Sequence, residues 1–208
     1  MDILIIDYGM GNLRNVQKAF EHIGVMARIS AEPDDLDRAD GLVLPGVGAF
    51  GDAMENLRAG GLVAPIRDNT EAGKPLLGIC LGLQLLFEES QEMGQHEGLG
   101  LLPGQVVRFG DELKVPHIGW NQFDWTEGAS EHPLVQDIPN HSYAYFVHSY
   151  YAAPTEQGCV LAMTEYGIDF ASLVGKGNVF GAQPHPEKSQ EVGLQLLKNF
   201  ARIVETQA

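Results

Sequence analysis

Cys80 stands between two glycines, in the run Gly78-Ile79-Cys80-Leu81-Gly82. This spacing is typical of a tight strand-to-helix turn that presents a nucleophile, and the glycines are needed because such a turn leaves no room for side chains. The turn would also place the sulfur at a helix N-terminus, where free N–H groups favour the thiolate. By itself, the pattern fits a buried structural cysteine about as well.

A cysteine nucleophile needs a base, and His185-Pro186-Glu187 is the best candidate to supply one. The flanking prolines favour an extended chain, in which residues two apart point the same way. A carboxylate beside the imidazole raises its basicity and stabilises the imidazolium. We therefore predict a triad of Cys80 as nucleophile, His185 as base and Glu187 as orienting group. A surface loop with an incidental ion pair is the alternative.

The remaining cysteine and histidines show no comparable context. Cys159 opens an apolar strand and is assigned to the core. The sequence has no C-x-x-C or H-x-x-x-H spacing, so we expect no metal site. The other histidines are His22, His96, His117, His132, His141 and His148.

Strands and helices alternate over the first half of the chain. Apolar runs predict strands at 3–8, 25–29, 41–44 and 75–80, and helical periodicity predicts helices at 13–23, 52–58, 62–69 and 81–89. This order is typical of a parallel sheet with helices on both faces, in which function gathers at the carboxyl ends of the strands. The turns at 9–12 and 45–48 and the Cys80 turn all lie at those ends.

After about residue 100 short β-rich runs predominate, at 106–109, 143–151, 160–166, 170–174 and 179–182, and an amphipathic helix begins near residue 189. We therefore predict an α/β fold with a central, mostly parallel sheet flanked by helices and an additional antiparallel β-rich part. Residues 1–208 are expected to form a single domain.

The composition argues against nucleic-acid binding and against association with a membrane. Thirteen basic against 28 acidic residues give a net charge of −15, which disfavours binding to nucleic acid. No apolar run approaches the ~20 residues of a membrane span, and the N-terminus lacks the features of a signal peptide. With only two cysteines, the chain is expected in the cytoplasm, with no membrane contact.

Several motifs together resemble the class I (triad) glutamine amidotransferases. Residues 78–84, GICLGLQ, are similar to the nucleophile motif of that family, and His185-Pro186-Glu187 is similar to its second signature. Within the family, glutaminase subunits of imidazole glycerol phosphate synthase are the nearer match, through the stretches 7–12, 45–50, 116–121 and 145–150. The resemblance covers essentially the whole chain. One departure is Pro184, where the family usually has an aromatic residue.

This resemblance implies hydrolysis of glutamine to glutamate and ammonia through a γ-glutamyl thioester on Cys80, without a cofactor. The oxyanion that forms needs hydrogen-bond donors. The resemblance implies that Leu81 supplies one N–H and that the 45–48 loop supplies another, around Val47 and Gly48. It also implies that glutamine is held by Gln84, Glu92, His148, Ser149 and Tyr150, with Glu92 suited to the α-ammonium group.

Ammonia would then pass to a cyclase subunit, a (β/α)8 barrel that forms a heterodimer with this chain. That subunit makes imidazole glycerol phosphate and AICAR (an aminoimidazole carboxamide ribotide) in histidine biosynthesis. Asn12, Trp120 and Lys188 are candidates for the interface; a helix cap, a core aromatic and a solvated cation are the alternative interpretations.

Three other functions remain open from the sequence. The chain could be the glutaminase of another complex, such as pyridoxal phosphate synthase, although the stretch 116–121 argues against it. It could be a stand-alone cysteine hydrolase or peptidase, which would turn over without a partner. It could also be a binding module on a mononucleotide-like sheet, but Gly9-Met10-Gly11 lacks the third glycine of a dinucleotide fingerprint.

Overall fold

The computed structural model describes residues 1–207. Its helices are α1 (Leu13–His22), α2 (Pro33–Arg38), α3 (Phe50–Ala59), α4 (Val63–Glu71), α5 (Leu81–Leu85) and α6 (Gln190–Gln207). Its strands in the first half are β1 (Ile3–Ile6), β2 (Ala27–Ser30), β3 (Gly41–Gly46), β4 (Leu76–Cys80), β5 (Phe87–Ser90) and β6 (His96–Glu97). Those in the second half are β7 (Leu102–Arg108), β8 (His117–Gln122), β9 (Asp124–Trp125), β10 (Tyr143–His148), β11 (Tyr150–Pro154), β12 (Val160–Glu165), β13 (Asp169–Lys176) and β14 (Val179–Ala182).

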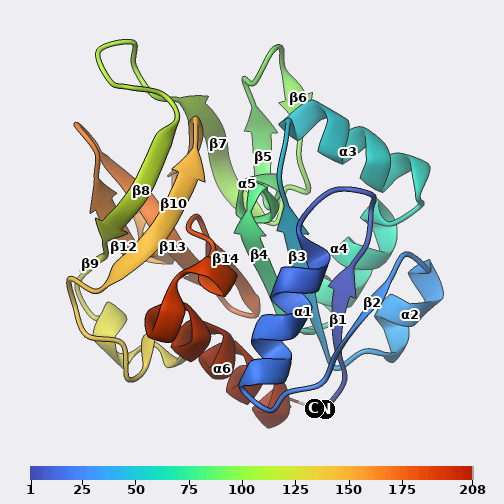
Figure 1. Ribbon diagram of the computed structural model, residues 1–208. Coiled ribbons are helices and arrows are strands. Elements are labelled where there is room, and N and C mark those ends of the chain that lie inside the picture. The colour runs from blue at the N-terminus through green and yellow to red at the C-terminus, as the bar shows by residue number, and fades with distance from the viewer. Residues whose placement is uncertain (208) are drawn as a thin grey trace.

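One large sheet organises the fold, in the order β2-β1-β3-β4-β14-β13-β11-β7-β5-β6 (Figure 1). Strands β2, β1, β3, β4 and β14 are parallel neighbours. From β14 onward most pairings are antiparallel, with β13 next to β14 and β11 next to both β13 and β7. The predicted α/β class, with a parallel centre and an antiparallel part, is confirmed.

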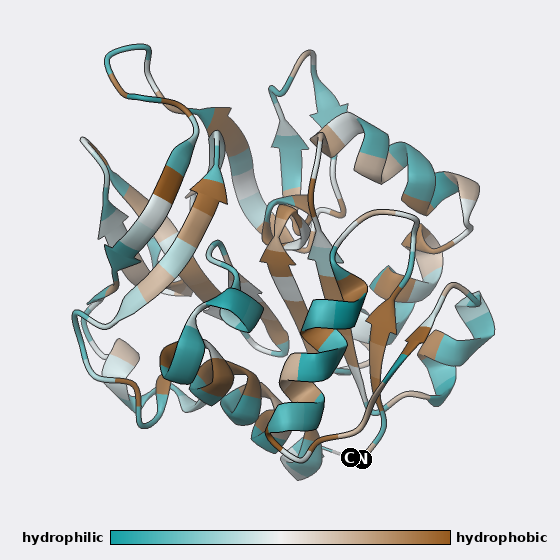
Figure 2. Cartoon of the chain, viewed as in Figure 1, coloured by the Kyte–Doolittle hydropathy of each residue, from teal (hydrophilic) through white to brown (hydrophobic). Residues whose placement is uncertain are grey.

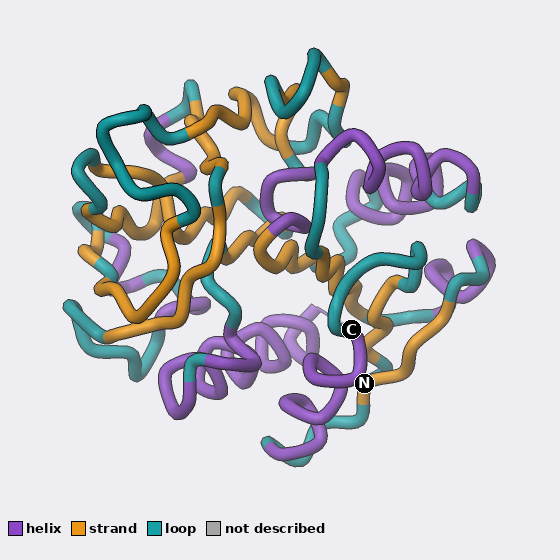
Figure 3. Tube along the Cα trace, turned by 45° about the horizontal axis from the view of Figure 1, so that its top comes forward, coloured by secondary structure: helices purple, strands orange, loops and turns teal. Residues whose placement is uncertain are grey.

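Side-chain alternation along the central strands builds two cores. Ile3 and Ile5 of β1 pack with α1 and α6 on one face, and Leu4 and Ile6 pack with α2, α3 and α4 on the other. All four side chains are fully buried, as expected for parallel strands covered on both faces. The two groups of helices lie on opposite sides of the strands (Figure 3), and the central strands are the most hydrophobic segments (Figure 2).

A separate two-stranded ribbon, β8 with β10, stands beside the antiparallel part of the sheet. It is antiparallel and in register from Tyr143 opposite Gln122 to His148 opposite His117. His148 therefore lies at the end of the ribbon, and only Ser149 separates it from β11. No helix within residues 1–207 is both long and apolar enough to cross a membrane.

The predicted helix at 81–89 is wrong in its second half. Helix α5 ends at Leu85, and β5 follows and pairs in parallel with β7. Leu85, Leu86 and Phe87 are all completely buried. A fully buried apolar run carries no periodicity that distinguishes a helix from a strand.

Candidate active site

Three parallel strands end side by side at one edge of the sheet. Gly46 at the end of β3 is paired with Cys80 at the end of β4, and Ala182 at the end of β14 is paired with Ile79. The segment that follows β14 contains His185. The sequence did not reveal that β14 inserts beside β4, yet this pairing brings residues about a hundred positions apart to the same place.

The turn at Cys80 has the tight geometry that its glycines predicted. Cys80 has φ 54° and ψ −108°, a left-handed conformation that is rare for a residue with a side chain, and α5 begins at the next residue. A Cβ at Gly78 would lie 2.6 Å from the carbonyl oxygen of Gly82. A Cβ at Gly82 would overlap the carbonyl oxygen of Leu44. The backbone can make this turn only with glycine at both positions.

His185 and Glu187 form a buried pair behind the cysteine. His185 Nδ1 lies 2.8 Å from Glu187 Oε1, and only 3% and 1% of the two side chains are exposed. Because a carboxylate oxygen accepts, Nδ1 carries the proton and donates it. The expected extended chain is only partly present, since His185 is extended but 186–188 form a 3-10 turn. The tight turn still brings the carboxylate back to the ring.

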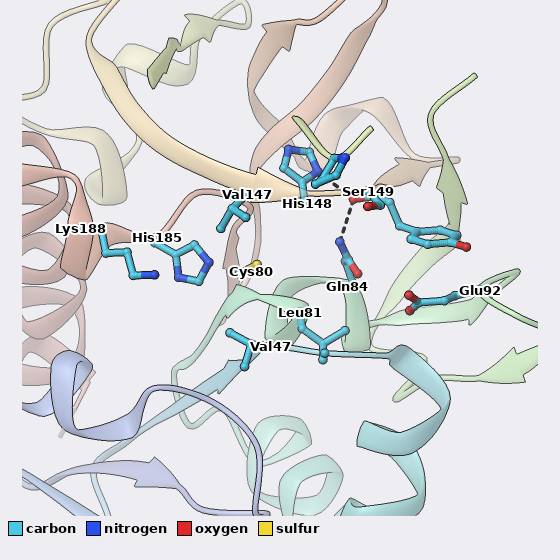
Figure 4. A pocket seen from close by; sticks show the side chains of 13 residues that line it. Val47, Cys80, Leu81, Gln84, Glu92, Val147, His148, Ser149, His185 and Lys188 are labelled. Atoms are coloured by element: carbon cyan, nitrogen blue, oxygen red, sulfur yellow. Dashed lines mark hydrogen bonds between the residues drawn. The ribbon is translucent and has the colours of Figure 1, made fainter. Parts of the chain in front are cut away.

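Several bonds hold His185 in place. Its backbone N–H donates to the carbonyl of Tyr145 in β10, and its own carbonyl accepts from Ser189 Oγ. The ring Nε2 is buried and has no hydrogen-bond partner of standard geometry within residues 1–207. The ring lies close to the Cys80 sulfur in Figure 4, so Nε2 is the atom left for the thiol.

The charge state of His185 follows from these neighbours. Burial disfavours a charged ring, but the interactions with Cys80 and Glu187 outweigh it and raise the pKa of His185 to about 10. The imidazole beside the sulfur is therefore a stronger base than a free imidazole. A histidine that has taken up a proton can later donate it to a leaving group.

A cavity of about 340 Å³ opens over Cys80 (Figure 4). Every predicted catalytic, oxyanion and glutamine-binding residue except Glu187 lines it, and Glu187 lies behind His185. The complete lining is Val47, Gly48, Cys80, Leu81, Gln84, Glu92, Pro116, Val147, His148, Ser149, Tyr150, His185 and Lys188. The structure thus gathers one set of residues from both halves of the chain.

The polar groups at the far end of the cavity are already organised. Gln84 Nε2 donates to the carbonyl of Tyr150 at 2.8 Å (Figure 4). It also donates to Gln183 Oε1 at 3.1 Å. Glu92 Oε2 accepts from the backbone N–H of Phe50 at 2.7 Å. Burial raises the pKa of Glu92 above its ordinary value, although the bond from Phe50 opposes this. A cationic ligand group beside the carboxylate would lower this pKa again.

His148 lines the cavity, but its ring nitrogens are both engaged. Nδ1 donates to the carbonyl of Tyr150 at 2.8 Å, so Nε2 accepts from His117 Nδ1 at 3.1 Å. Burial lowers the pKa of His148 to about 3, so the ring is neutral. His148 therefore serves this site by fixing the Tyr150 backbone, and no ring N–H is left for a ligand.

Sequence reasoning assigned no role to His117 or Gln183. His117 completes the bond chain to His148, and Gln183 bonds to Gln84 and lies 3.9 Å from the Cys80 sulfur through its Nε2. Gln183 directly precedes the Pro184-His185 pair, but a buried glutamine has no motif that would mark it. Cys159, in contrast, is buried as expected and its thiol donates to the carbonyl of Glu156.

The oxyanion donors predicted from the resemblance lie on two sides of Cys80. The Leu81 N–H is at the start of α5, where no earlier turn of helix uses it. Val47 is 44% exposed, and Gly48 has φ 103°. Strand β3 extends through Gly46, so only 47 and 48 of the expected 45–48 loop are free of the sheet, and 47–49 connect β3 to α3. We call 47–49 the oxyanion loop.

The three predicted interface residues are exposed near this edge of the sheet. Asn12 precedes α1 and makes no side-chain capping bond. Trp120 is 46% exposed and packs edge-on against Tyr145. Lys188 Nζ lies 5.8 Å from the centre of the same Tyr145 ring. Trp120 is therefore a surface aromatic and not a core residue.

Comparison with known families agrees with this geometry. The model of the family described as glutamine amidotransferase class-I matches residues 4–204. The chain belongs to this family. Solved structures share the fold: one described as "Crystal structure of glutamine amidotransferase" aligns with a TM-score of 0.76 over 98% of both chains at 22% identity. The PurLQS structure from Thermotoga maritima aligns with a TM-score of 0.75 at 19% identity, also over 98% of both chains.

Closer amidotransferase relatives share one name, imidazole glycerol phosphate synthase subunit HisH. The protein from Syntrophotalea carbinolica is 54% identical, covering 95% of this chain and 98% of the relative. Those from Moorella thermoacetica and Geobacter metallireducens are 53% and 52% identical, covering 97% and 96% of this chain and 95% and 97% of the relatives.

Proposed function

We propose that this amidotransferase hydrolyses glutamine to glutamate and ammonia, and that the ammonia serves a cyclase subunit of imidazole glycerol phosphate synthase. The observation that carries the proposal is the His185–Glu187 pair. It is buried behind Cys80, with Nδ1 bonded to the carboxylate and Nε2 left for the thiol. The HisH relatives support the choice of acceptor.

In the proposed reaction the Cys80 thiolate attacks the side-chain amide carbon of glutamine. The proton held by His185 passes to the leaving nitrogen, and ammonia departs as the C–N bond breaks. The product is a γ-glutamyl thioester. Water then attacks that carbonyl, giving up a proton to His185, and glutamate leaves as the sulfur is released. Glu187 holds the imidazole in the required tautomer throughout.

Both attacks place negative charge on the substrate oxygen. We propose that the N–H of Leu81 and an N–H of the oxyanion loop, at Val47 or Gly48, stabilise it. Glu92 would bind the α-ammonium group of glutamine, and Gln84, Ser149 and Tyr150 would hold the rest of the molecule. His148 would act through the Tyr150 backbone.

The HisH relatives, which are named as subunits of a synthase, support the partner assignment. We propose that the cyclase is a (β/α)8 barrel that docks over Asn12, Trp120 and Lys188 to form a heterodimer, and that the complex works in the cytoplasm. Docking there would cover the mouth of the cavity, which Lys188 lines.

Glutamate release with matched cysteine variants tests the proposal. Cys80→Ala should abolish glutamine hydrolysis by the complex, because the nucleophile is lost. Cys159→Ala should retain it, because that thiol is buried in the core. Circular dichroism of both variants checks that the fold is kept. Hydrolysis of glutamine by Cys80→Ala at the wild-type rate would refute the mechanism.

We further propose that the partner controls the rate. A chain that released ammonia without an acceptor would waste glutamine, and the oxyanion loop can change conformation cheaply because Gly48 tolerates positive φ. Loss of one oxyanion donor costs ~10²–10³ in rate. Turnover should therefore rise from the free chain to the complex, and again with the acceptor nucleotide. Equal turnover in all three states would favour a stand-alone hydrolase.

A further inference from the structure

One polar group next to the oxyanion loop is not used by the mechanism above. The hydroxyl of Tyr8 is buried and has no hydrogen-bond partner within residues 1–207, and only 6% of the residue is exposed. Leaving a buried hydroxyl unpaired costs free energy, so it needs an explanation. Tyr8 does not line the cavity over Cys80.

The position of this hydroxyl is defined by Gly46. A Cβ at Gly46 would overlap the Tyr8 hydroxyl, and it would lie 3.0 Å from the Leu81 Cβ. Gly46 is paired with Cys80 and is the last residue of β3 before the oxyanion loop. The unpaired hydroxyl therefore lies against Gly46, the residue directly before the oxyanion loop.

Tyr8 remains a donor at every working pH. Burial, and to a smaller extent the neighbouring Cys80, raise the pKa of the Tyr8 phenol above its ordinary value. The hydroxyl makes no bond with the Cys80 sulfur in this structure. A backbone carbonyl is the partner that Gly46 can offer it.

Rotation of the Gly46–Val47 peptide would exchange the directions of its two polar groups. Turning the Val47 N–H into the cavity would turn the Gly46 carbonyl away from it. Tyr8 lies beside Gly46 and does not line the cavity, so its hydroxyl is placed to meet a carbonyl that turns away from the cavity. Since the hydroxyl has no partner now, the conformation seen here does not contain that bond. The rotated conformation would gain one hydrogen bond without any movement of Tyr8.

We propose that Tyr8 is a positioning residue for the oxyanion loop, whose hydroxyl donates to the Gly46 carbonyl when the Val47 N–H faces the substrate oxyanion. This role rests on the proposed glutaminase function. The bond would stabilise only the competent loop, so it should affect the chemical step more than the binding of glutamine.

Tyr8→Phe tests the role because it removes one oxygen atom. With the cyclase and its acceptor nucleotide present, kcat for glutamine should fall about tenfold, the effect of losing one hydrogen bond of ordinary net strength. KM for glutamine should change by less than about twofold. The Tm of the free chain should stay the same or rise, because an unpaired buried hydroxyl is lost.

Tyr166→Phe is the matched control. The Tyr166 hydroxyl has a partner, since it donates to the carbonyl of Lys114 at 2.7 Å. Its removal should lower the Tm slightly and leave kcat close to the wild-type value. The opposite pattern in the two variants, with kcat lost only in Tyr8→Phe, supports the proposal.

The rate at which iodoacetamide alkylates Cys80, measured across pH, shows whether Tyr8 instead acts on the ionisation of the sulfur. Tyr8→Phe should match the wild-type profile. A shifted profile would overturn the proposal, as would an unchanged kcat or a Tm that falls as in Tyr166→Phe.

If the wild-type complex releases no glutamate, both the proposed function and the Tyr8 role fail. Wild-type turnover with an unaffected Tyr8→Phe variant contradicts the Tyr8 role alone.

Discussion

At the scale of single residues, the protons on His185 and His148 distinguish two histidines that line the same cavity. His185 has a buried carboxylate on one side and a sulfur on the other, and its pKa is raised to about 10. His148 is buried, with His117 and the Tyr150 carbonyl as its hydrogen-bond partners, and burial lowers its pKa to about 3. One ring can exchange protons with a substrate, and the other is a fixed neutral support.

The roles of base and orienting group predict unequal losses. His185→Ala should lower kcat/KM for glutamine by about 10²–10⁴-fold, the usual contribution of acid–base catalysis. Glu187→Gln should lose less, because the amide oxygen can still accept from Nδ1 although its negative charge is gone. Steady-state glutamate release measures both variants. An equal or smaller loss in His185→Ala would assign the base to another residue.

Because His148 is held neutral, the free energy of unfolding should depend on pH. Its folded pKa lies below the ordinary value of about 6.5, so the unfolded chain binds the proton first as pH falls. The stabilising contribution is complete above about pH 6.5 and is lost as pH falls toward 3, by about 1.4 kcal/mol per pH unit. The free energy of unfolding in urea should fall over this range.

His148→Asn should lower the free energy of unfolding at pH 7, because the hydrogen bonds of the native imidazole are lost. Between pH 6.5 and 5 the free energy of unfolding of the variant should change less with pH than that of the wild type. Carboxylates titrate mostly below that window, and the other buried histidines are the same in both proteins. Identical slopes in the two proteins would mean that His148 is not held neutral.

At the scale of elements, the turn between β4 and α5 packs directly against the backbone of the neighbouring strand β3. Gly82→Ala places a Cβ on the Leu44 carbonyl of the neighbouring strand. We expect a loss of about 3 kcal/mol in the free energy of unfolding, because the obstacle is backbone and cannot rotate away. Gly158→Ala is the control, since a Cβ there meets nothing within 4 Å. Urea unfolding compares them, and similar stability of the two variants would contradict the close approach.

The same turn illustrates what a sequence can predict. Gly78, Cys80 and Gly82 are adjacent in the chain, so their spacing was enough to predict the elbow. The place of His185 depends on β14 pairing with β4, a contact between distant segments that no local pattern encodes. The context of His185-Pro186-Glu187 marked the histidine as a candidate base, but it did not predict the strand pairing that brings it to Cys80. Helix α5 was predicted too long because its apolar continuation is buried on all sides, and the 3-10 turn at 186–188 was missed.

At the scale of the whole molecule, the cavity opens at an edge that carries exposed apolar side chains. Val47, Ile118, Trp120 and Tyr143 are each at least 44% exposed, and Lys188 lies among the cavity residues. An aromatic residue that is exposed in the free chain is typical of the centre of a protein interface.

Trp120→Ala should therefore weaken binding of the cyclase subunit by about 30-fold, the effect of losing a contact worth about 2 kcal/mol. The Tm of the free chain should change little, since the side chain is half exposed. Met26→Ala is the control, because Met26 is 84% exposed and precedes β2 at the opposite edge of the sheet. Calorimetric titration measures both, and equal affinities would remove Trp120 from the interface.

The central claim is that Cys80 attacks glutamine, and a glutamine analogue with an electrophilic side chain tests it most directly. The complex is treated with the analogue, digested and examined by mass spectrometry. We predict one adduct, on Cys80, that forms more slowly when glutamine is added and in the His185→Ala variant. An adduct on Cys159, or labelling of Cys80 that glutamine does not slow, would contradict the assignment.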